Sequence, residues 1–241
     1  MIKYMNIVGA KARRAFEEKV NTVIKNKVLS KYAELLSKEK KLILKQNLKD
    51  VNYARKIGVK NNLISRLMIN ENQLKDIQNS IIKISKLKDP VGNTLEKWKR
   101  PNGLNISKIS IPIGVIGVIY ESRPNVTSDV ASLCFKSGNP VILKGGSEAI
   151  NTNRVLAKIF RKALRINKVD ENFIQFIDTK QRRVVDIMLS SMKKYIDVII
   201  PRGGKNLVKR VQDLSNVPII GHLEGLCHTY IDRDANLDMS K

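Results

Sequence analysis

The strongest constraint on the fold is a set of short apolar runs that alternate with helical stretches through the second half of the chain. The runs have the length of strands, and the stretches between them have the spacing of amphipathic helices. Short buried strands alternating with helices are typical of βαβ units, which form a parallel sheet covered on both faces. The sequence therefore predicts an open α/β domain. Its expected strands are 113–120, 141–143, 173–177, 198–200 and 217–220, and its expected helices are 126–137, 148–164, 183–192 and 205–214.

The first hundred residues have helical spacing instead. Asn70 suits the N-cap of one helix, with Gln73 three residues further on. The pair Asp89–Pro90 is expected to end that helix, because proline disfavours the α region for the residue before it. Residues 103–111 then alternate with the period of an extended strand. The apolar stripes expected to pack in a core are Val28, Tyr32, Leu35 and Leu36, then Leu44, Leu48 and Val51, and finally Leu74, Ile77, Ile81 and Ile84.

The net charge of +23 raises the question of nucleic-acid binding. Clustered lysine and arginine bind nucleic acid by releasing counterions from phosphate. Here residues 1–110 carry 25 basic and 9 acidic side chains, and residues 111–241 carry 20 and 13. The excess is mostly lysine scattered along expected helices, without interleaved aromatic residues or a zinc-ligand spacing. This distribution favours solvated helix faces over nucleic-acid recognition.

Compartment signals favour the cytoplasm. No apolar run is long enough to cross a bilayer, and no secretory signal opens the chain. The first sixteen residues lack acids and contain Arg13 and Arg14, as transit peptides do, but they also lack serine and continue into a helical pattern. Cys134 and Cys227 are far apart and fit reduced thiols better than a disulfide framework. We expect no metal site.

Two of the expected strands end in glycine pairs that open a helix. The first is followed by Lys144-Gly145-Gly146-Ser147 and the second by Arg202-Gly203-Gly204. In open α/β sheets, ligands bind beyond the carboxyl ends of the strands, and free N–H groups at a helix start attract phosphate. Neither stretch is a GxGxxG or Walker A motif, so each is also compatible with an ordinary tight turn. Two such turns on one sheet favour a nucleotide site.

A series of motifs gives the sequence a specific resemblance. Taken in order along the chain, it is similar to the gamma-glutamyl phosphate reductases, also called glutamate-5-semialdehyde dehydrogenases, of the aldehyde dehydrogenase superfamily. The motifs are Asp89-Pro90-Val91-Gly92, Arg100-Pro101-Asn102-Gly103-Leu104, Gly114-Val115-Ile116-Gly117-Val118-Ile119-Tyr120-Glu121-Ser122-Arg123-Pro124-Asn125-Val126-Thr127, Lys136-Ser137-Gly138-Asn139, Lys144-Gly145-Gly146-Ser147-Glu148-Ala149, Pro201-Arg202-Gly203-Gly204 and His222-Leu223-Glu224-Gly225-Leu226-Cys227-His228.

The resemblance implies NADPH-dependent reduction of gamma-glutamyl phosphate to glutamate-5-semialdehyde and phosphate, a step of proline biosynthesis. It implies a Rossmann-like sheet and a small-molecule substrate, without nucleic-acid or membrane partners, and is compatible with a homo-oligomer. In this reading Asn125 is the oxyanion donor. Lys144 and Ser147 contact the adenosine ribose and its 2′-phosphate, with Gly145 in the same turn, and Gly203 and Gly204 lie near the pyrophosphate.

One departure from the resemblance concerns the nucleophile. The family's cysteine sits in a Cys-Asn motif shortly after the last matching segment, and no Cys-Asn pair occurs in this chain. Cys227 and Cys134 are weak substitutes, and His222 is expected to be structural. We therefore expect a C-terminally truncated chain with three parts: helices at 1–102, the NADPH-binding sheet with a flap strand at 103–226, and the start of the catalytic domain at 227–241. Three alternatives stay open: an active enzyme whose missing half comes from a second polypeptide or a readthrough product, a non-catalytic NADPH-binding or oligomer-associating fragment, and a degraded gene product.

Overall fold

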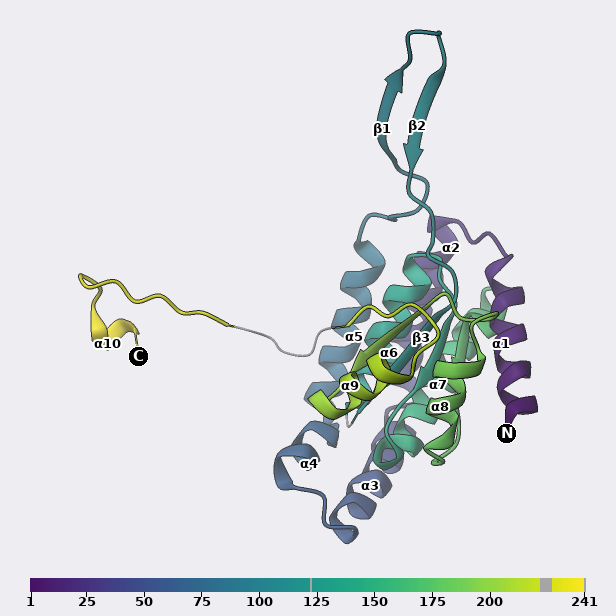
Figure 1. Cartoon of the computed structure of the whole chain (residues 1–241). Helices are drawn as coiled ribbons and strands as arrows, with labels where there is room; N and C mark the ends of the chain where they lie inside the picture. The colour runs from purple at the N-terminus through teal and green to yellow at the C-terminus, as the bar shows by residue number, and fades with distance from the viewer. Residues whose placement is uncertain (122, 222–226, 241) are drawn as a thin grey trace.

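A parallel sheet of four strands lies at the centre of the molecule (Figure 1). The computed structural model describes residues 1–121, 123–221 and 227–240. The sheet comprises β3 (Ile116–Tyr120), β4 (Val141–Lys144), β5 (Ile174–Phe176) and β6 (Val198–Arg202), in the order β5-β4-β3-β6. Every neighbouring pair is parallel. The predicted open α/β sheet is therefore confirmed.

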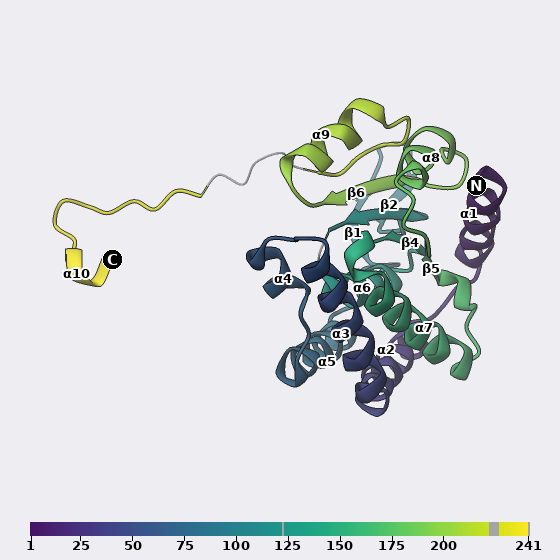
Figure 2. The same ribbon diagram turned by 90° about the horizontal axis from the view of Figure 1, so that it is seen from below.

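Helices cover both faces of this sheet, as Figure 2 shows. Side chains alternate between the faces along each strand. Val118 and Leu143 enter a core with α2 (Thr22–Lys38), α5 (Glu71–Lys86), α6 (Pro124–Lys136) and α7 (Ile150–Ile166). Ile119 and Ile142 enter a second core with α1 (Ile2–Phe16), α8 (Arg183–Ser191) and α9 (Lys205–Leu214). Strands buried on both sides explain the continuous apolar runs of the sequence. The remaining helices are α3 (Lys40–Lys56), α4 (Asn61–Leu67) and the four-residue α10 (Leu237–Ser240).

The N-terminal helices form largely as predicted. The Asn70 side chain accepts a hydrogen bond from the Gln73 backbone amide, and the Gln73 side chain accepts one from the Asn70 amide, so the two residues form a capping box. The apolar stripes of α2 and α5 are buried. The stripe predicted on α3 is wrong at Leu48, which is 57% exposed. That helix instead buries Asn47 and Asp50, whose polar groups find partners in distant segments.

A two-stranded antiparallel hairpin projects from the body (Figure 1). The strand expected within 103–111 is β2 (Asn105–Ile109), and its partner is β1 (Thr94–Lys99). Both strands lie outside the two cores of the sheet. Apolar side chains such as Leu95 and Trp98 are therefore exposed on the hairpin.

Several predicted boundaries shift. The apolar run at 113–120 contains a strand only from Ile116, and the strand expected at 217–220 is a single bridge between Ile219 and Ile199. The helix expected at 126–137 begins at Pro124, because proline is preorganised for the first helical position. A 3₁₀ turn, Ser147–Ala149, precedes α7. Among the described residues, no helix is long and apolar enough to cross a membrane.

Candidate functional site

A cavity of about 810 Å³ opens at the carboxyl ends of β3, β4 and β6. Five of the six predicted site residues line it: Lys144, Gly145, Ser147, Gly203 and Gly204. They meet because β4 and β6 both pair with β3, so the turns that follow these two strands face each other across its end. The structure thus brings together two turns that lie about sixty residues apart in the sequence.

Lys144 is the most buried cation of this cavity, at 7% exposure. Its ammonium group donates a hydrogen bond to the Gly145 carbonyl oxygen at 2.6 Å. Burial lowers the pKa of Lys144, and the nearby Glu148 carboxylate acts in the opposite direction. A desolvated ammonium group with a single neighbouring carboxylate gains from the approach of an additional anion.

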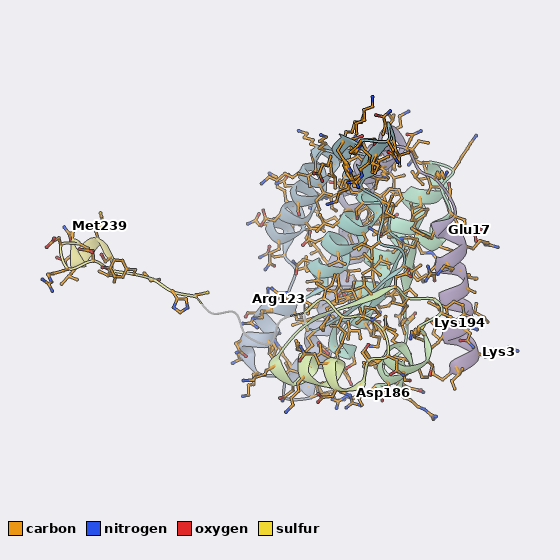
Figure 3. All side chains as sticks on the ribbon, turned by 45° about the horizontal axis from the view of Figure 1, so that its top comes forward. Lys3, Glu17, Arg123, Asp186, Lys194 and Met239 are labelled. Carbon is orange, nitrogen blue, oxygen red and sulfur yellow. The ribbon has the colours of Figure 1, made fainter. Side chains whose placement is uncertain are left out.

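The lining of the cavity is strongly cationic. Seven basic residues line it against two acidic ones, Glu121 and Glu148, which leaves an excess of five positive charges. Such a concave basic surface raises the local concentration of anionic ligands. Figure 3 shows Arg123 on the side of the body that faces residues 227–240. The basic residues are Arg66, Arg123, Lys144, Lys180, Arg182, Arg202 and Arg210.

The structure gives Gly145 a role in internal packing. A Cβ atom on this residue would collide with the side-chain amide nitrogen of Asn153 and would lie 3.0 Å from the Tyr120 ring. Both neighbours are buried, and the Asn153 oxygen accepts a hydrogen bond from the Thr127 hydroxyl at 2.9 Å. The absence of a side chain at Gly145 therefore lets the turn lie directly on the protein interior.

The turn after β6 already binds an anionic group. A Glu121 carboxylate oxygen accepts a hydrogen bond from the Gly204 amide at 2.9 Å, at the N-terminus of α9. A Cβ on Gly203 would lie only 2.6 Å from the same oxygen. The contact shows that this amide can bind an anionic oxygen. Sequence reasoning did not single out Glu121, although its position directly after β3 places it at the carboxyl edge of the sheet.

Asn125 lies apart from the other predicted residues. It lines a smaller cavity of about 380 Å³, and its side-chain amide donates a hydrogen bond to Asp129 at 3.2 Å. Arg66 lines both cavities. Sequence reasoning missed Asp129, although its spacing of four residues from Asn125 places both on one face of α6.

Neither cysteine lines a described cavity. Cys134 is buried in α6, where burial raises the pKa of its thiol to about 12, and Cys227 is exposed. Residues 227–240 lie away from the body of the molecule (Figure 1). His222 and the adjacent motif residues 223–226 lie outside the described residues. Within 1–121, 123–221 and 227–240, no group of three His, Cys, Asp or Glu side chains could hold a metal ion.

Comparisons with known proteins show which sequences and structures this chain is similar to. The chain is 45% identical to a gamma-glutamyl phosphate reductase of Clostridium tetani over 241 residues, which cover 99% of this chain and 56% of the relative. It superposes on the crystal structure of the Thermotoga maritima gamma-glutamyl phosphate reductase with a TM-score of 0.85 and 39% identity, covering 88% of this chain and 51% of the other. The chain is a partial-length homologue of the gamma-glutamyl phosphate reductases. No family model matches it.

Further comparisons place the fold. The yeast gamma-glutamyl phosphate reductase superposes with a TM-score of 0.82 at 31% identity over 97% of this chain and 60% of the other. A probable aldehyde dehydrogenase of Listeria monocytogenes gives a TM-score of 0.68 at 17% identity, which shows the shared fold alone. The aldehyde dehydrogenase-like fold predicted from the sequence is confirmed. The chain spans about half the length of the gamma-glutamyl phosphate reductases it matches.

Proposed function

We propose that this chain binds NADPH in the larger cavity and serves the reduction of gamma-glutamyl phosphate to glutamate-5-semialdehyde and phosphate in proline biosynthesis. The observation that carries the proposal is the meeting of the two glycine turns and Lys144 in one cationic cavity. The relatives that match nearly the whole length of this chain are named gamma-glutamyl phosphate reductase, which supports the same assignment.

In this proposal the two strand ends divide the dinucleotide between them. Lys144 and Ser147 bind the 2′-phosphate and adenosine ribose, with Gly145 holding the turn against Asn153. The amides of Gly203 and Gly204 face the pyrophosphate, which replaces the Glu121 carboxylate at the start of α9. The bound cofactor supplies a hydride, and the chain's own residues supply binding and orientation.

The substrate acyl group is proposed to lie at Asn125, in the smaller cavity, which shares the lining residue Arg66 with the larger one. A primary amide carries two N–H donors. One donates to Asp129, and this bond orients the second toward an acyl oxygen that gains negative charge during attack. The family's reaction also needs a thiolate, and neither Cys134 nor Cys227 lies at either cavity. We therefore assign to this chain the binding of cofactor and acyl group, and not the covalent step. We also propose that the chain has three parts: helices at 1–102, the NADPH-binding sheet with a flap strand at 103–226, and the start of a catalytic domain at 227–241.

A comparison of NADPH with NADH tests the assignment. We expect NADPH to bind at least about tenfold more tightly in a fluorescence titration, because a charge-assisted contact to the 2′-phosphate contributes on the order of 1.4 kcal/mol or more. Replacing Lys144 with alanine should weaken NADPH binding and narrow this preference. Lys209→Ala, on an exposed residue of α9 that does not line the cavity, is the matched control. Equal affinity of the unmodified chain for both nucleotides would refute the proposal.

A further inference from the structure

The smaller cavity beside Asn125 combines an apolar lining with groups of both charges. It lies between α5 and the start of α6, and Arg66 connects it with the larger cavity. Apolar surface of this kind suits a short methylene chain, whereas the charged side chains require a ligand with ionised groups. The lining residues are Arg66, Met68, Ile69, Gln73, Asp76, Ile77, Ser80, Pro124, Asn125 and Asp129.

Asp129 is a half-buried carboxylate that accepts hydrogen bonds from neutral side chains. The Ser80 hydroxyl donates to one of its oxygens at 3.0 Å, and the Asn125 amide donates to the other at 3.2 Å. Burial raises the pKa of Asp129. No lysine or arginine among the described residues forms an ion pair with it. A carboxylate accepts about four hydrogen bonds, so two sites are left, and an incoming ammonium group would offset the cost of burial.

Arg66 supplies the opposite charge in the lining of the same cavity. Its guanidinium forms neither an ion pair nor a hydrogen bond within the part of the chain that the structure describes. Its planar fork suits bidentate binding of a carboxylate. Asp76, also on the rim, is exposed and likewise unpaired among those residues.

We propose that this cavity binds the α-amino-acid end of the substrate, with the ammonium group on Asp129 and the α-carboxylate on Arg66. An α-amino acid carries both charges on one carbon, and the cavity offers the complementary pair within one small volume. The acyl end of the same molecule then lies at Asn125, next to Asp129. The inference rests on the proposed function for the identity of the substrate, and it names the groups that select an amino acid over a simple dicarboxylate.

Three small molecules separate the contributions of the two charges. L-glutamate carries both groups, glutarate lacks the ammonium group, and 4-aminobutyrate lacks the α-carboxylate. Binding of each to the full ¹⁵N-labelled chain is measured by NMR titration. We expect L-glutamate to bind about tenfold more tightly than either analogue, because each analogue leaves one charged side chain unpaired.

Two variants should lose different preferences. Asp129→Asn should abolish the preference for glutamate over glutarate and keep the preference over 4-aminobutyrate, and Arg66→Gln should do the reverse. Asp213→Asn and Arg100→Gln, which line neither cavity, are matched controls and should keep both preferences. Thermal unfolding of each variant shows whether the chain is folded.

Two results would overturn the inference. One is equal binding of the three molecules, or no saturable shift with glutamate. The other is an equal loss for all three in Asp129→Asn, which would indicate that Asp129 only supports the structure. NADPH titration of the same samples keeps the two proposals distinct. NADPH binding without selection of glutamate refutes this inference alone, and selection of glutamate without NADPH binding refutes the proposed cofactor function.

Discussion

Replacing Asp50 with alanine should destabilise the chain more than any exposed substitution. Asp50 lies on α3, is 1% exposed, and caps the start of α7 from outside that helix. Its two oxygens accept hydrogen bonds from the Asn151 amide at 3.2 Å, the Asn151 side chain at 2.8 Å, the Thr152 amide at 2.7 Å and the Thr152 hydroxyl at 2.6 Å. The carboxylate thus satisfies two N–H groups that the helix itself leaves unpaired.

The magnitude follows from the groups left without a partner. Loss of an N-terminal cap costs about 0.5–2 kcal/mol, and a buried donor left unsatisfied costs about 1–3 kcal/mol. We therefore expect Asp50→Ala to lower the free energy of unfolding by about 3 kcal/mol. For a chain of this length, that corresponds to a fall in melting temperature of about 6–12 °C. Asp50→Asn keeps one acceptor oxygen and should lose about half as much.

Urea unfolding monitored by circular dichroism measures this loss. The midpoint should fall while the slope with denaturant stays constant, since the exposed area on unfolding does not change. Asp213→Ala, which removes an exposed carboxylate from α9, should leave the midpoint in place. A loss below about 0.5 kcal/mol in Asp50→Ala would show that Asp50 does not stabilise the start of α7, because that is the range of an ordinary surface substitution.

Three further outcomes are expected. Gly145→Ala should lower the free energy of unfolding in urea by about 1–3 kcal/mol, because its Cβ would collide with Asn153. Gly204→Ala should be tolerated, because its Cβ would lie 3.8 Å from Glu121. Equal losses in the two variants would contradict the packing role of Gly145. A thiol reagent at pH 8 should label only Cys227 in the folded chain and both cysteines in urea, because burial raises the pKa of Cys134 to about 12; rapid labelling of two thiols in the native state would count against this. The purified 241-residue chain should not oxidise glutamate-5-semialdehyde with NADP and phosphate, since neither cysteine lies at the cavities; turnover that Cys227→Ser abolishes would make Cys227 the nucleophile.

Local patterns were sufficient to predict the sheet and the two glycine turns. Strand-length apolar runs reflect burial on both faces, and a glycine pair before a helix is visible in any reading of the sequence. The error at Leu48 has a different origin. Asn47 is buried in its place because its side chain bonds the backbone of Leu67 and Ile69, and these partners lie about twenty residues away. Helical periodicity carries no information about such contacts.

Some residues of the candidate site could be predicted from the sequence and others could not. Lys144 and the glycine turns follow from their places at the ends of strands. Glu121 and Asp129 were missed because their roles depend on which atoms they face. Glu121 accepts a hydrogen bond from Gly204, which is 83 positions away in the chain, and Asp129 accepts one from the Ser80 hydroxyl, which is 49 positions away. The hairpin partner Thr94–Lys99 was missed for a similar reason, since a two-stranded ribbon outside the cores has no apolar face to mark it.

The proposed dinucleotide site is the cationic cavity between the turns after β4 and β6. The most direct test is a crystal structure of this chain with NADP bound. We expect the 2′-phosphate within hydrogen-bond distance of Lys144 or Ser147 and the pyrophosphate on the amides of Gly203 and Gly204. The Glu121 carboxylate should be displaced from Gly204. A dinucleotide bound elsewhere, or one in the cavity with its 2′-phosphate away from both Lys144 and Ser147, would contradict the proposed site.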